Sequence, residues 1–537
     1  MADALFTEVK YSGDDGGPVP TATQYRNPVV AGFHPDPSAV RVGDDFYLVN
    51  SSFGFFPGLP VFHSRDLVNW TQIGNAIDRP EQMDFGHNEL TRGLFAASIS
   101  HHDDTFYIVN TCFYCSGGNF VITAKNPAGP WSQPHWLKFD GIDPALFFDE
   151  DGRAWMVHNG LPDRPMRYDG HRAIWLQEFD PKTLTMVGKA QVLVDSGIDP
   201  ESNPEHVEGP HLFRRNGWYY LIAAQGGTGE QHAEMVWRSR KVTGPYEAAP
   251  NNPVLTQRDL DPSRPSPVTS TGHAEFIELK DGSWWSVFLG TRPYRGNQYN
   301  LGRETFLLPM QWQNGWPTVL PPGKEVPLVA ERPALPSTPA AQPTTGPFQW
   351  SESFTANKLP FSWVTVNIPR SPWFSTGDGL RIQASDVPLG EFKRGQPAFV
   401  GHRLQHHHAT LETTLDPNTL ASGEQAGLAV LQNEAHYYAL MRVEDAEGAA
   451  VVLYRRSNNE QPLQGEALAR AALPKGSDPL HLRFQLNGPT LDAAWSSGNG
   501  DWQVLATQQD ASILSNDVAG GFTGVIFGPY ALRHASP

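Results

Sequence analysis

The strongest constraint on the fold of this chain is a hairpin unit that recurs along its first part. One copy reads VEGPHLFRRNGWYYLI at 207–222, where an Asn-Gly turn separates two short strands. Asn-Gly between such runs is typical of a hairpin, because both central residues of a type I′ turn need positive φ. Similar units are centred on Phe46, Phe106, Ala154 and Trp284. Aligned with Tyr219, successive units are 60, 48, 65 and 65 residues apart. Five hairpin repeats with little helical periodicity predict a five-bladed β-propeller.

One position near the start of each unit should face the propeller axis. Glu208 lies 11 residues before Tyr219, and the equivalent positions lie 11 residues before the other centres, or 10 in the first unit. Because equivalent positions in propeller blades lie at equal radius, we expect five side chains to surround one cavity: Asp36, Phe95, Asp143, Glu208 and His273. Four polar or ionisable groups at one radius are costly to bury without a purpose. This ring is therefore the predicted functional site.

The length of the chain predicts two domains, since 537 residues exceed one ordinary hydrophobic core. The repeats occupy 27–320 and follow a polar N-terminal extension, 1–26. Segment 321–347 is rich in Pro and Ala, which predicts a semi-rigid linker. Apolar and polar residues then alternate in runs such as HYYALMRV (436–443), which predicts an antiparallel β-sandwich over 348–537. The expected fold class is all-β: an N-terminal five-bladed propeller followed by a C-terminal sandwich.

Charge limits the partners of this chain. Its formal net charge is −17 and no run rich in Lys or Arg compensates, so neither nucleic acid nor an anionic membrane is an expected partner. The N-terminal residues lack the pattern of a secretory signal, and no apolar run approaches 18 residues. The expected compartment is the cytoplasm, or the periplasm or the exterior if a signal peptide preceded this sequence. A neutral substrate is the simplest expectation, and assembly into a homo-oligomer stays open.

The two cysteines of the chain, Cys112 and Cys115, flank Phe113-Tyr114 in a predicted strand. A lone Cys-x-x-Cys is compatible with a redox pair or with half of a zinc site. The sequence has no second pair, and in a strand these two side chains would point to opposite faces. We therefore expect two buried free thiols.

The chemistry that the ring allows is cleavage of a glycosidic bond. This reaction needs one protonated carboxyl group to protonate the leaving oxygen and one ionised carboxylate. Glu208 is the predicted general acid, because burial beside another carboxylate raises its pKa. Asp36 is the predicted base that activates water, and Asp143 supplies a third charge that keeps Glu208 protonated. The alternative for both aspartates is structural, since Asp before Pro commonly starts a turn, and His273 alone also fits a core histidine.

Five motifs in this chain resemble, in the same order, those of glycoside hydrolase family 43, and the closest likeness is to its two-domain β-xylosidases and α-L-arabinofuranosidases. They are NPVVAGFHPDPSAVRVGDDFYLVNSSFGFFPGLPVFHSRDLVNW (27–70), GIDPALFFDEDGR (141–153), VEGPHLFRRNGWYYL (207–221), GHAEF (272–276) and LGRETF (301–306). The resemblance implies a five-bladed propeller followed by a concanavalin-like jelly-roll sandwich, and a reaction that inverts the anomeric centre. It places Asp36 on the general base, Asp143 on an aspartate that modulates the pKa of the acid, and Glu208 on the general acid.

The resemblance also implies residues that bind the terminal sugar. Phe53 and Phe95 fall on aromatic residues of its subsite, and Arg303 falls on an arginine that contacts its hydroxyls, the alternative for Arg303 being a salt bridge with Glu304 or another acid. His273 matches a histidine at the floor of the site that is associated with a bound calcium or a water cluster in a number of members. No cofactor is expected for the chemistry. A structural Ca²⁺ near His273 is the one metal to look for, although a lone imidazole is a poor ligand for a hard cation.

This chain departs from the family pattern in two places. It has Phe95-Ala96-Ala97 where many members have Trp-Ala-Pro, which makes the wall of the site smaller. In members of the family a loop of the sandwich carries a phenylalanine toward the mouth of the site. The corresponding stretch here, FTGVIFGPYALRHASP (522–537), offers Ile526 or Phe527 for that position.

The predicted function is an inverting exo-glycosidase that removes terminal pentoses from xylo-oligosaccharides or arabinoxylan-type fragments. β-D-Xylose is the first choice for the released sugar and α-L-arabinofuranose is close behind, because their hydroxyls are similarly placed. One alternative of a different class is a non-catalytic sugar-binding propeller, which has no need of a proton donor. Another is an endo-acting arabinanase of the same fold, for which no appended sandwich is expected.

Overall fold

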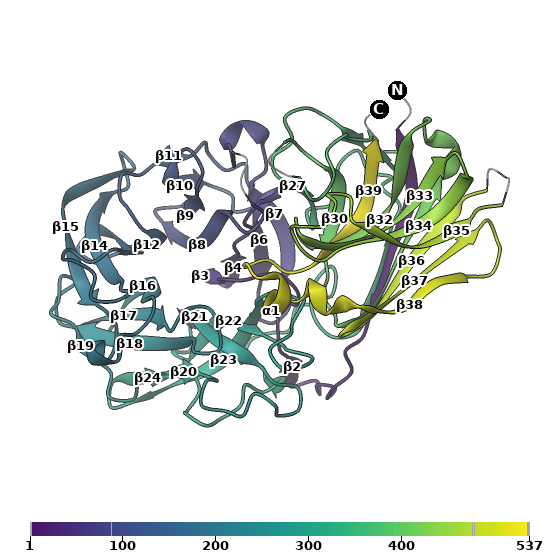
Figure 1. Ribbon diagram of the computed structural model, residues 1–537. Coiled ribbons are helices and arrows are strands. Elements are labelled where there is room, and N and C mark those ends of the chain that lie inside the picture. Colours follow the sequence, from purple (N-terminus) through teal and green to yellow (C-terminus); the bar gives the residue numbers. More distant parts are fainter. Residues whose placement is uncertain (1–2, 87–88, 392–393, 475, 477, 534–537) are drawn as a thin grey trace.

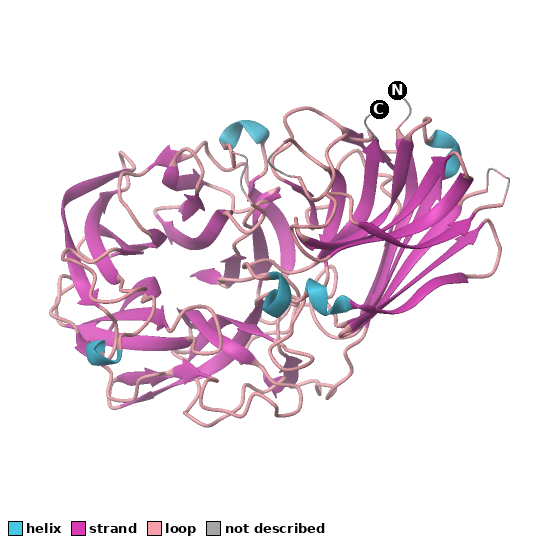
Figure 2. Ribbon diagram, viewed as in Figure 1, coloured by secondary structure: helices cyan, strands magenta, loops and turns pink. Residues whose placement is uncertain are grey.

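Almost all regular structure in this protein is β-structure. The computed structural model describes residues 3–86, 89–391, 394–474, 476 and 478–533. Within these ranges there is one short α-helix, α1 (Asn516–Ala519), and Figure 2 shows magenta strands gathered into two groups. The single-turn 3-10 helices are Pro80–Gln82, Pro200–Ser202, Pro417–Thr419 and Ala511–Leu514. No helix in this part of the chain is long and apolar enough to span a membrane.

The first group is a five-bladed propeller, as predicted from the repeats (Figure 1). Each blade is antiparallel, and its first strand lies closest to the central axis. Blades 1 and 2 consist of β3 (Ser38–Val42), β4 (Asp45–Val49), β6 (Gly58–Ser64) and β7 (Thr71–Ile77), then β8 (Gly93–His102), β9 (Thr105–Phe113), β10 (Gly118–Ala124) and β11 (His135–Trp136). Blade 3 consists of β12 (Ile142–Phe148), β13 (Ala154–Gly160), β14 (Ala173–Asp180) and β15 (Thr185–Asp195). Blades 4 and 5 consist of β16 (Glu208–Arg215), β17 (Trp218–Gln225), β18 (Ala233–Ser239), β19 (Glu247–Ala248) and β20 (Leu255–Thr256), then β21 (Thr269–Glu278), β22 (Trp284–Thr291), β23 (Glu304–Gln313) and β24 (Trp316–Thr318).

The hairpin between β16 and β17 shows why these repeats fold as blades. Asn216 and Gly217 both have positive φ, 52° and 72°, so the two strands are joined by a tight two-residue turn with Arg215 opposite Trp218. Aromatic side chains then fill the space between neighbouring blades. Phe213 stacks on Tyr220 with ring centroids 5.1 Å apart and also meets Trp284 of blade 5.

The second group is the predicted β-sandwich, formed by two eight-stranded sheets that enclose one apolar core. The first sheet contains β28 (Phe374–Ser375), β29 (Leu380–Ile382), β1 (Ala4–Gly13), β31 (His408–Asp416), β36 (Leu480–Asn487), β37 (Thr490–Ser497) and β38 (Gln503–Asp510), with β26 (Phe348–Glu352) paired to β1. The second contains β35 (Glu466–Ala472), β34 (Gly448–Arg456), β33 (His436–Asp445), β32 (Glu424–Asn433), β39 (Ile526–Arg533), β30 (Ala398–Arg403), β27 (Trp363–Val366) and β5 (Phe55–Phe56).

The N-terminal segment 1–26 is not the simple extension that the sequence suggested. β1 lies in the interior of the first sandwich sheet, where it pairs with β31 from Leu5↔Asp416 to Gly13↔Ala409 and also with β26 and β29. Phe6, Val9 and Tyr11 enter the sandwich core from this strand. β2 (Gln24–Arg26) lies outside the sandwich and pairs with β25 (Val329–Glu331). The start of the chain is therefore a structural part of the C-terminal domain.

Removing residues 1–13 is therefore expected to destabilise the sandwich severely. The deletion uncovers the edge of β31 and removes Phe6, Val9 and Tyr11, each at most 1% exposed. Burying a large apolar side chain stabilises by about 1.5–3 kcal/mol, so the loss is on the order of 5–9 kcal/mol, comparable with the stability of a whole domain. Urea unfolding followed by tryptophan fluorescence measures it, with Phe6→Ala as the milder variant at about 3–5 kcal/mol. An unchanged urea midpoint in the truncated protein would contradict this role of β1.

The proline-rich segment 321–347 joins the domains but is packed against the propeller. Its β25 pairs with β2, and Arg332 forms a 2.8 Å ion pair with Asp66 of blade 1. The Thr344 carbonyl also accepts a hydrogen bond from the Ala31 amide at 2.8 Å. These contacts hold the predicted linker against the propeller.

The sandwich also shares a sheet with the propeller. The two-residue strand β5, from the loop between β4 and β6 of blade 1, pairs with β27 at the edge of the second sandwich sheet. Phe33, Phe53 and Phe55 of the propeller and Ile526 of the sandwich belong to one buried apolar cluster. The loop that carries Phe53 is thus held by both domains.

The expectation of two free thiols is wrong, because Cys112 and Cys115 form a disulfide. The rule that alternate side chains point to opposite faces holds only within a strand, and β9 ends at Phe113. Tyr114 takes a left-handed conformation with φ of 62°, which turns the chain so that Cys115 returns toward Cys112. The disulfide therefore closes a tight turn at the end of β9.

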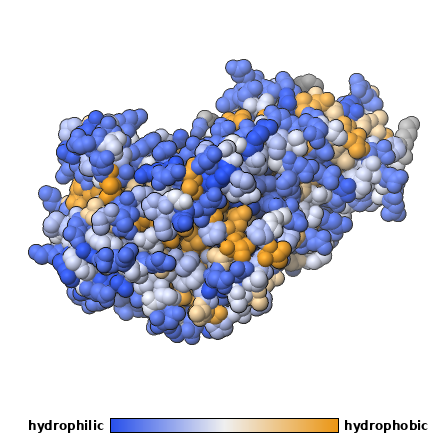
Figure 3. All heavy atoms as spheres, turned by 90° about the horizontal axis from the view of Figure 1, so that it is seen from below, coloured by the Kyte–Doolittle hydropathy of each residue, from blue (hydrophilic) through white to orange (hydrophobic). Residues whose placement is uncertain are grey.

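The face of the molecule in Figure 3 is mostly hydrophilic, and its hydrophobic residues gather in a few separate patches. This agrees with the acidic composition of the chain.

Candidate active site

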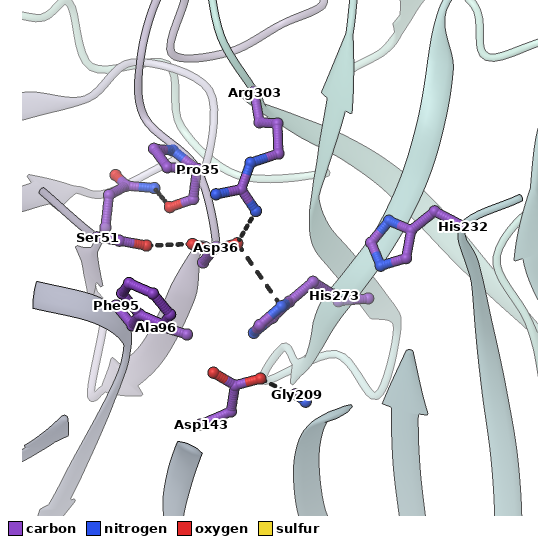
Figure 4. A network of polar contacts seen from close by, with 12 residues as sticks. Pro35, Asp36, Ser51, Phe95, Ala96, Asp143, Gly209, His232, His273 and Arg303 are labelled. Carbon is purple, nitrogen blue, oxygen red and sulfur yellow. Dashed lines mark hydrogen bonds and ion pairs between the residues drawn. The ribbon is translucent and has the colours of Figure 1, made fainter. Parts of the chain in front are cut away.

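The candidate site lies where the innermost strands of the blades begin. In blades 2 to 5 the pairing between the first two strands is interrupted by an irregularity in register at this level, between Leu94/Ala97, Ile142/Ala145, Glu208/His211 and Gly272/Glu275. Such bulges re-aim side chains and are common next to active sites. Phe95, Asp143, Glu208 and His273 lie in or at the edges of these interruptions, and Asp36 lies just before β3. Figure 4 shows Asp36, Asp143 and His273 directed toward one another.

Local backbone strain accompanies this arrangement. Asp36, Asp143 and His273 have positive φ values of 51°, 55° and 50°, which is uncommon for residues other than glycine. Each such residue costs about 1–3 kcal/mol and persists only where its surroundings enforce it. Both aspartates precede a proline, which cannot donate to a strand ladder and so suits a bulge. The Asp-Pro pairs are thus structural turns and also aim the carboxyl groups into the site.

Asp36 is the most strongly bound carboxyl group of the site. Arg303 Nη1 donates to its Oδ1 at 2.7 Å, the Ser51 hydroxyl donates to its Oδ2, and His273 Nδ1 lies 3.6 Å from Oδ1. Burial by itself raises the pKa of Asp36, but the nearby Arg303, His273 and Ser51 outweigh it and hold the pKa below its ordinary value of 3.8. Asp36 is therefore ionised over the physiological range.

The pKa values of Glu208 and Asp143 are shifted upward, in the opposite direction to that of Asp36. Burial, followed by the charges of Asp143 and Asp36, raises the pKa of Glu208 well above its ordinary value of 4.5. Burial and the Asp36 charge also raise the pKa of Asp143 to about 7, although the Gly209 amide donates to its Oδ2 at 3.0 Å. Gly209 is required here, because its φ is 58° and an added Cβ would lie 2.8 Å from the His273 ring. The site therefore pairs an ionised carboxylate with a carboxyl group that keeps its proton.

Arg303 and three phenylalanines form one wall of the site. The Arg303 guanidinium is 5% exposed and lies 5.7 Å from the ring centres of both Phe53 and Phe522. The charge of Arg303 is paired with Asp36. The alternative salt bridge with Glu304 does not form, because Glu304 is bound by Arg292 at 2.7 and 2.9 Å. Arg303 Nε has no hydrogen-bond partner among the described residues. The Phe95 ring lies 5.2 Å from that of Phe53.

The surroundings of His273 do not form a protein-ligated metal site. The Nδ1 atom of His273 faces Asp36, and burial lowers the pKa of its imidazole to about 4. Its neighbour His232 donates from Nδ1 to the Ser270 carbonyl oxygen at 2.9 Å. The described residues contain no group of three or more His, Cys, Asp or Glu side chains that could hold a metal ion. A calcium ion prefers six to eight oxygen ligands, so the residues around His273 do not fit one.

Comparison with known proteins assigns the chain to a family. The profile of Glycosyl hydrolases family 43 matches residues 25–317, and that of the Beta xylosidase C-terminal Concanavalin A-like domain matches residues 351–537. The chain is 35% identical over 521 residues to a non-reducing end α-L-arabinofuranosidase of Bacteroides ovatus, with 94% of this chain and 91% of that protein covered. The chain belongs to glycoside hydrolase family 43.

Other members of family 43 agree along nearly the full chain. A protein named xylosidase/arabinosidase from Butyrivibrio fibrisolvens is 34% identical over 519 residues, which cover 94% of this chain and 95% of that one. The crystal structure of a GH43_12 from a capybara gut metagenome superposes with a TM-score of 0.91 and 36% identity, covering 99% of this chain and 100% of the other. The chain is thus a glycoside hydrolase with a family 43 propeller and a concanavalin-like sandwich, as the sequence motifs indicated.

The site of this hydrolase contains residues that sequence reasoning missed or misplaced. The aromatic ring that the sandwich brings to the site belongs to Phe522, whereas Ile526 and Phe527 are fully buried in β39. The Phe522 amide donates to Thr91 Oγ1 at 2.8 Å, and its ring lies 6.0 Å from Phe53 and 6.2 Å from Phe95. The prediction of Ile526 or Phe527 was wrong because both side chains are buried in β39, whereas Phe522 in the preceding loop contacts Phe53 and Phe95. Ser51 was also missed, since nothing in its motif distinguishes it from a loop serine.

Proposed function

We propose that this family 43 enzyme is an inverting exo-glycosidase that removes terminal pentoses from xylo-oligosaccharides or arabinoxylan-type fragments. Asp36 is the general base, Glu208 is the general acid and Asp143 tunes the pKa of Glu208. The observation that carries the proposal is the contrast between two buried carboxyl groups of the site: Asp36 is bound by Arg303 at 2.7 Å, which holds its pKa low, whereas Glu208 is buried near Asp143 and Asp36, which raises its pKa. One acid and one base with separated pKa values are what glycoside hydrolysis requires.

The reaction proceeds in one displacement step. Asp36 removes a proton from a water molecule as the water oxygen bonds to the anomeric carbon from one face of the sugar. Glu208 gives its proton to the glycosidic oxygen as the bond from that oxygen to the anomeric carbon breaks. The products are a free pentose with inverted anomeric configuration and a shortened oligosaccharide. Asp36 then holds a proton and Glu208 has lost one, and solvent restores both.

Binding of the terminal sugar involves the wall formed by Arg303 and the phenylalanines, which lies beside Asp36. The Arg303 guanidinium beside Asp36 is suited to a sugar hydroxyl, and the rings of Phe53 and Phe95 are suited to the apolar face of the sugar. Phe522 covers this wall from the sandwich and supports exo-action, because a covered site admits a chain end more readily than a chain interior. The printed names of the relatives support a xylose- or arabinose-releasing activity.

Release of nitrophenol from nitrophenyl β-D-xyloside and nitrophenyl α-L-arabinofuranoside tests this proposal. We expect turnover of at least one, with the ratio of the two kcat/KM values giving the sugar preference. A predominance of the arabinofuranoside would make α-L-arabinofuranosidase the main activity. If neither is turned over while xylo-oligosaccharides still bind, the protein is a non-catalytic sugar-binding propeller and the proposal is wrong.

Replacing Asp143 with asparagine is expected to move the alkaline limb of the kcat profile to lower pH. Burial is the largest cause of the raised pKa of Glu208, and the Asp143 charge raises it further. Without that charge Glu208 loses its proton at lower pH, so activity declines earlier as pH rises. Because the two groups titrate together, the limb reports the pair rather than one residue. The profile of kcat against pH for both proteins measures the shift, and an alkaline limb that stays in place would exclude this role for Asp143.

A further inference from the structure

A second surface feature adjoins the candidate site between blades 2 and 3. It is a groove of about 490 Å³ formed by the turn after β9, the start of β10 and the segment before β12. Its lining includes Phe113, Tyr114, Lys138, Phe139 and Gly141. We propose that this groove, which we call the blade 2–3 groove, binds the sugar units on the leaving-group side of the scissile bond. The inference rests on the proposed function and extends it to the substrate beyond the terminal sugar.

An aromatic contact links the groove to the wall of the candidate site. The Phe95 ring stacks on the Phe113 ring with centroids 4.6 Å apart and planes 18° apart, so one aromatic stack runs from the site into the groove. A second link runs through the segment before β12, because Gly141 of the groove lies two residues before Asp143. The Asp143 carboxyl group accepts a hydrogen bond from the amide of Gly209, the residue after Glu208. Phe522, from the sandwich, contacts Phe53, Phe95 and Arg303 of this same wall. A leaving group protonated by Glu208 would then extend along the Phe95–Phe113 stack into this groove.

The aromatic residues of the groove are fixed in place although they are near solvent. Tyr114 is 68% exposed, yet its backbone is held in the turn that the Cys112–Cys115 disulfide closes. The Arg92 guanidinium lies 5.5 Å from the Phe113 ring centre and 5.1 Å from that of Tyr114. An exposed ring that is already ordered loses little conformational entropy when a ligand stacks on it.

The floor of the groove is also rigid. Asn119 Nδ2 donates to the carbonyl oxygens of Phe139 and Gly141 at 3.1 and 3.0 Å, and Asn119 Oδ1 accepts from the Thr111 hydroxyl at 2.6 Å. These bonds tie blade 2 to the segment that leads into Asp143. The Phe139 ring stacks on His158 at 4.2 Å. Aromatic faces with polar groups at the rim, here Lys138 and Asp140, match the apolar faces and outward hydroxyls of a pyranose chain.

Steady-state hydrolysis of xylo-oligosaccharides of increasing length tests this inference with the variant Tyr114→Ala. We expect kcat/KM for xylotetraose to fall about three- to tenfold, the loss of one aromatic contact, and the fall to become smaller as the substrate shortens toward a nitrophenyl glycoside. Phe361→Ala is the matched control, because Phe361 is another exposed ring, 53% exposed, that does not line the groove. An equal effect of Tyr114→Ala at every length, or none, would overturn the proposal.

The disulfide gives an independent test of the same groove. Cys115→Ser, or treatment of the native enzyme with a phosphine reductant, should reproduce the length-dependent loss, and the reductant should have no further effect on Cys115→Ser. A loss that is independent of substrate length would show a general effect on folding and would count against the groove.

Binding to the Glu208→Gln enzyme separates this inference from the proposed function. Calorimetric titration with xylobiose and xylotetraose should show tighter binding of the longer ligand, with the difference reduced by Tyr114→Ala. If the native enzyme turns over no glycoside but this difference persists, the proposed function fails and the groove assignment holds. If the enzyme is active and xylotetraose binds no better than xylobiose, the groove assignment fails alone.

Discussion

Replacing Glu208 with alanine is expected to lower kcat for a xylo-oligosaccharide by about 10²–10⁴, the usual contribution of a positioned general acid. The sugar leaving group is a poor one and needs the proton that burial keeps on Glu208. A dinitrophenyl glycoside has a leaving group that departs without a proton, so its kcat should fall much less. Parallel assays of both substrates measure the difference. Equal losses on the two would show that Glu208 positions the substrate or the fold instead of donating a proton.

Glu208→Gln serves as the fold control for this experiment. The pKa of Glu208 is raised in the folded state, so the native protein holds this proton more tightly than the unfolded chain does, and the contribution of Glu208 to stability falls as pH rises above about 4.5. Glutamine has the same size and no charge to desolvate. Its Tm at neutral pH is therefore expected to equal or exceed that of the native enzyme, while the activity on oligosaccharides is lost.

Replacing Asp36 with asparagine is expected to lower kcat by about 10²–10⁴ for activated and unactivated substrates alike, because every leaving group needs the attacking water. This pattern differs from that of Glu208→Ala and so identifies which carboxyl group is the base. The change also leaves the Arg303 guanidinium buried without its 2.7 Å partner, and breaking a buried ion pair costs about 3–5 kcal/mol. Assays at a temperature well below the Tm of the variant separate the two effects.

For Asp36→Asn, a loss of activity confined to oligosaccharides would contradict the assignment of the base. A variant as stable as the native protein would instead contradict the pairing of Asp36 with Arg303.

The propeller and the ring of side chains could be predicted because both follow from local repetition. Each hairpin is encoded by its own turn and alternating strands, and a position counted back from the hairpin lands on the same radius in every blade. The bulges at Asp143 and Glu208 disturb this count little, since the same interruption recurs in blades 2 to 5. The hairpin that recurs along the sequence therefore places its equivalent residues at equivalent positions in the blades.

The parts that could not be predicted depend on contacts between distant segments. β1 pairs with residues about 400 positions away, Leu5 with Asp416, and no local pattern indicates which sheet it joins. Phe522 reaches Phe53 across the domain boundary, and its loop has no periodicity to read. The Cys112–Cys115 disulfide forms because β9 ends at Phe113, between the two cysteines. The sequence pattern does not define the end of a strand to within one residue.

In the proposed mechanism, Asp36 and Glu208 act together on opposite faces of the sugar in a single displacement. Proton NMR of the sugar first released from a β-D-xyloside, recorded before mutarotation, tests it most directly. We expect α-xylose to appear first and β-xylose to follow only as the anomers equilibrate; for an α-L-arabinofuranoside we expect the β-anomer first. Initial release of β-xylose from the β-D-xyloside would mean that a covalent intermediate forms, and the assignment of Asp36 as a base that activates water would be wrong.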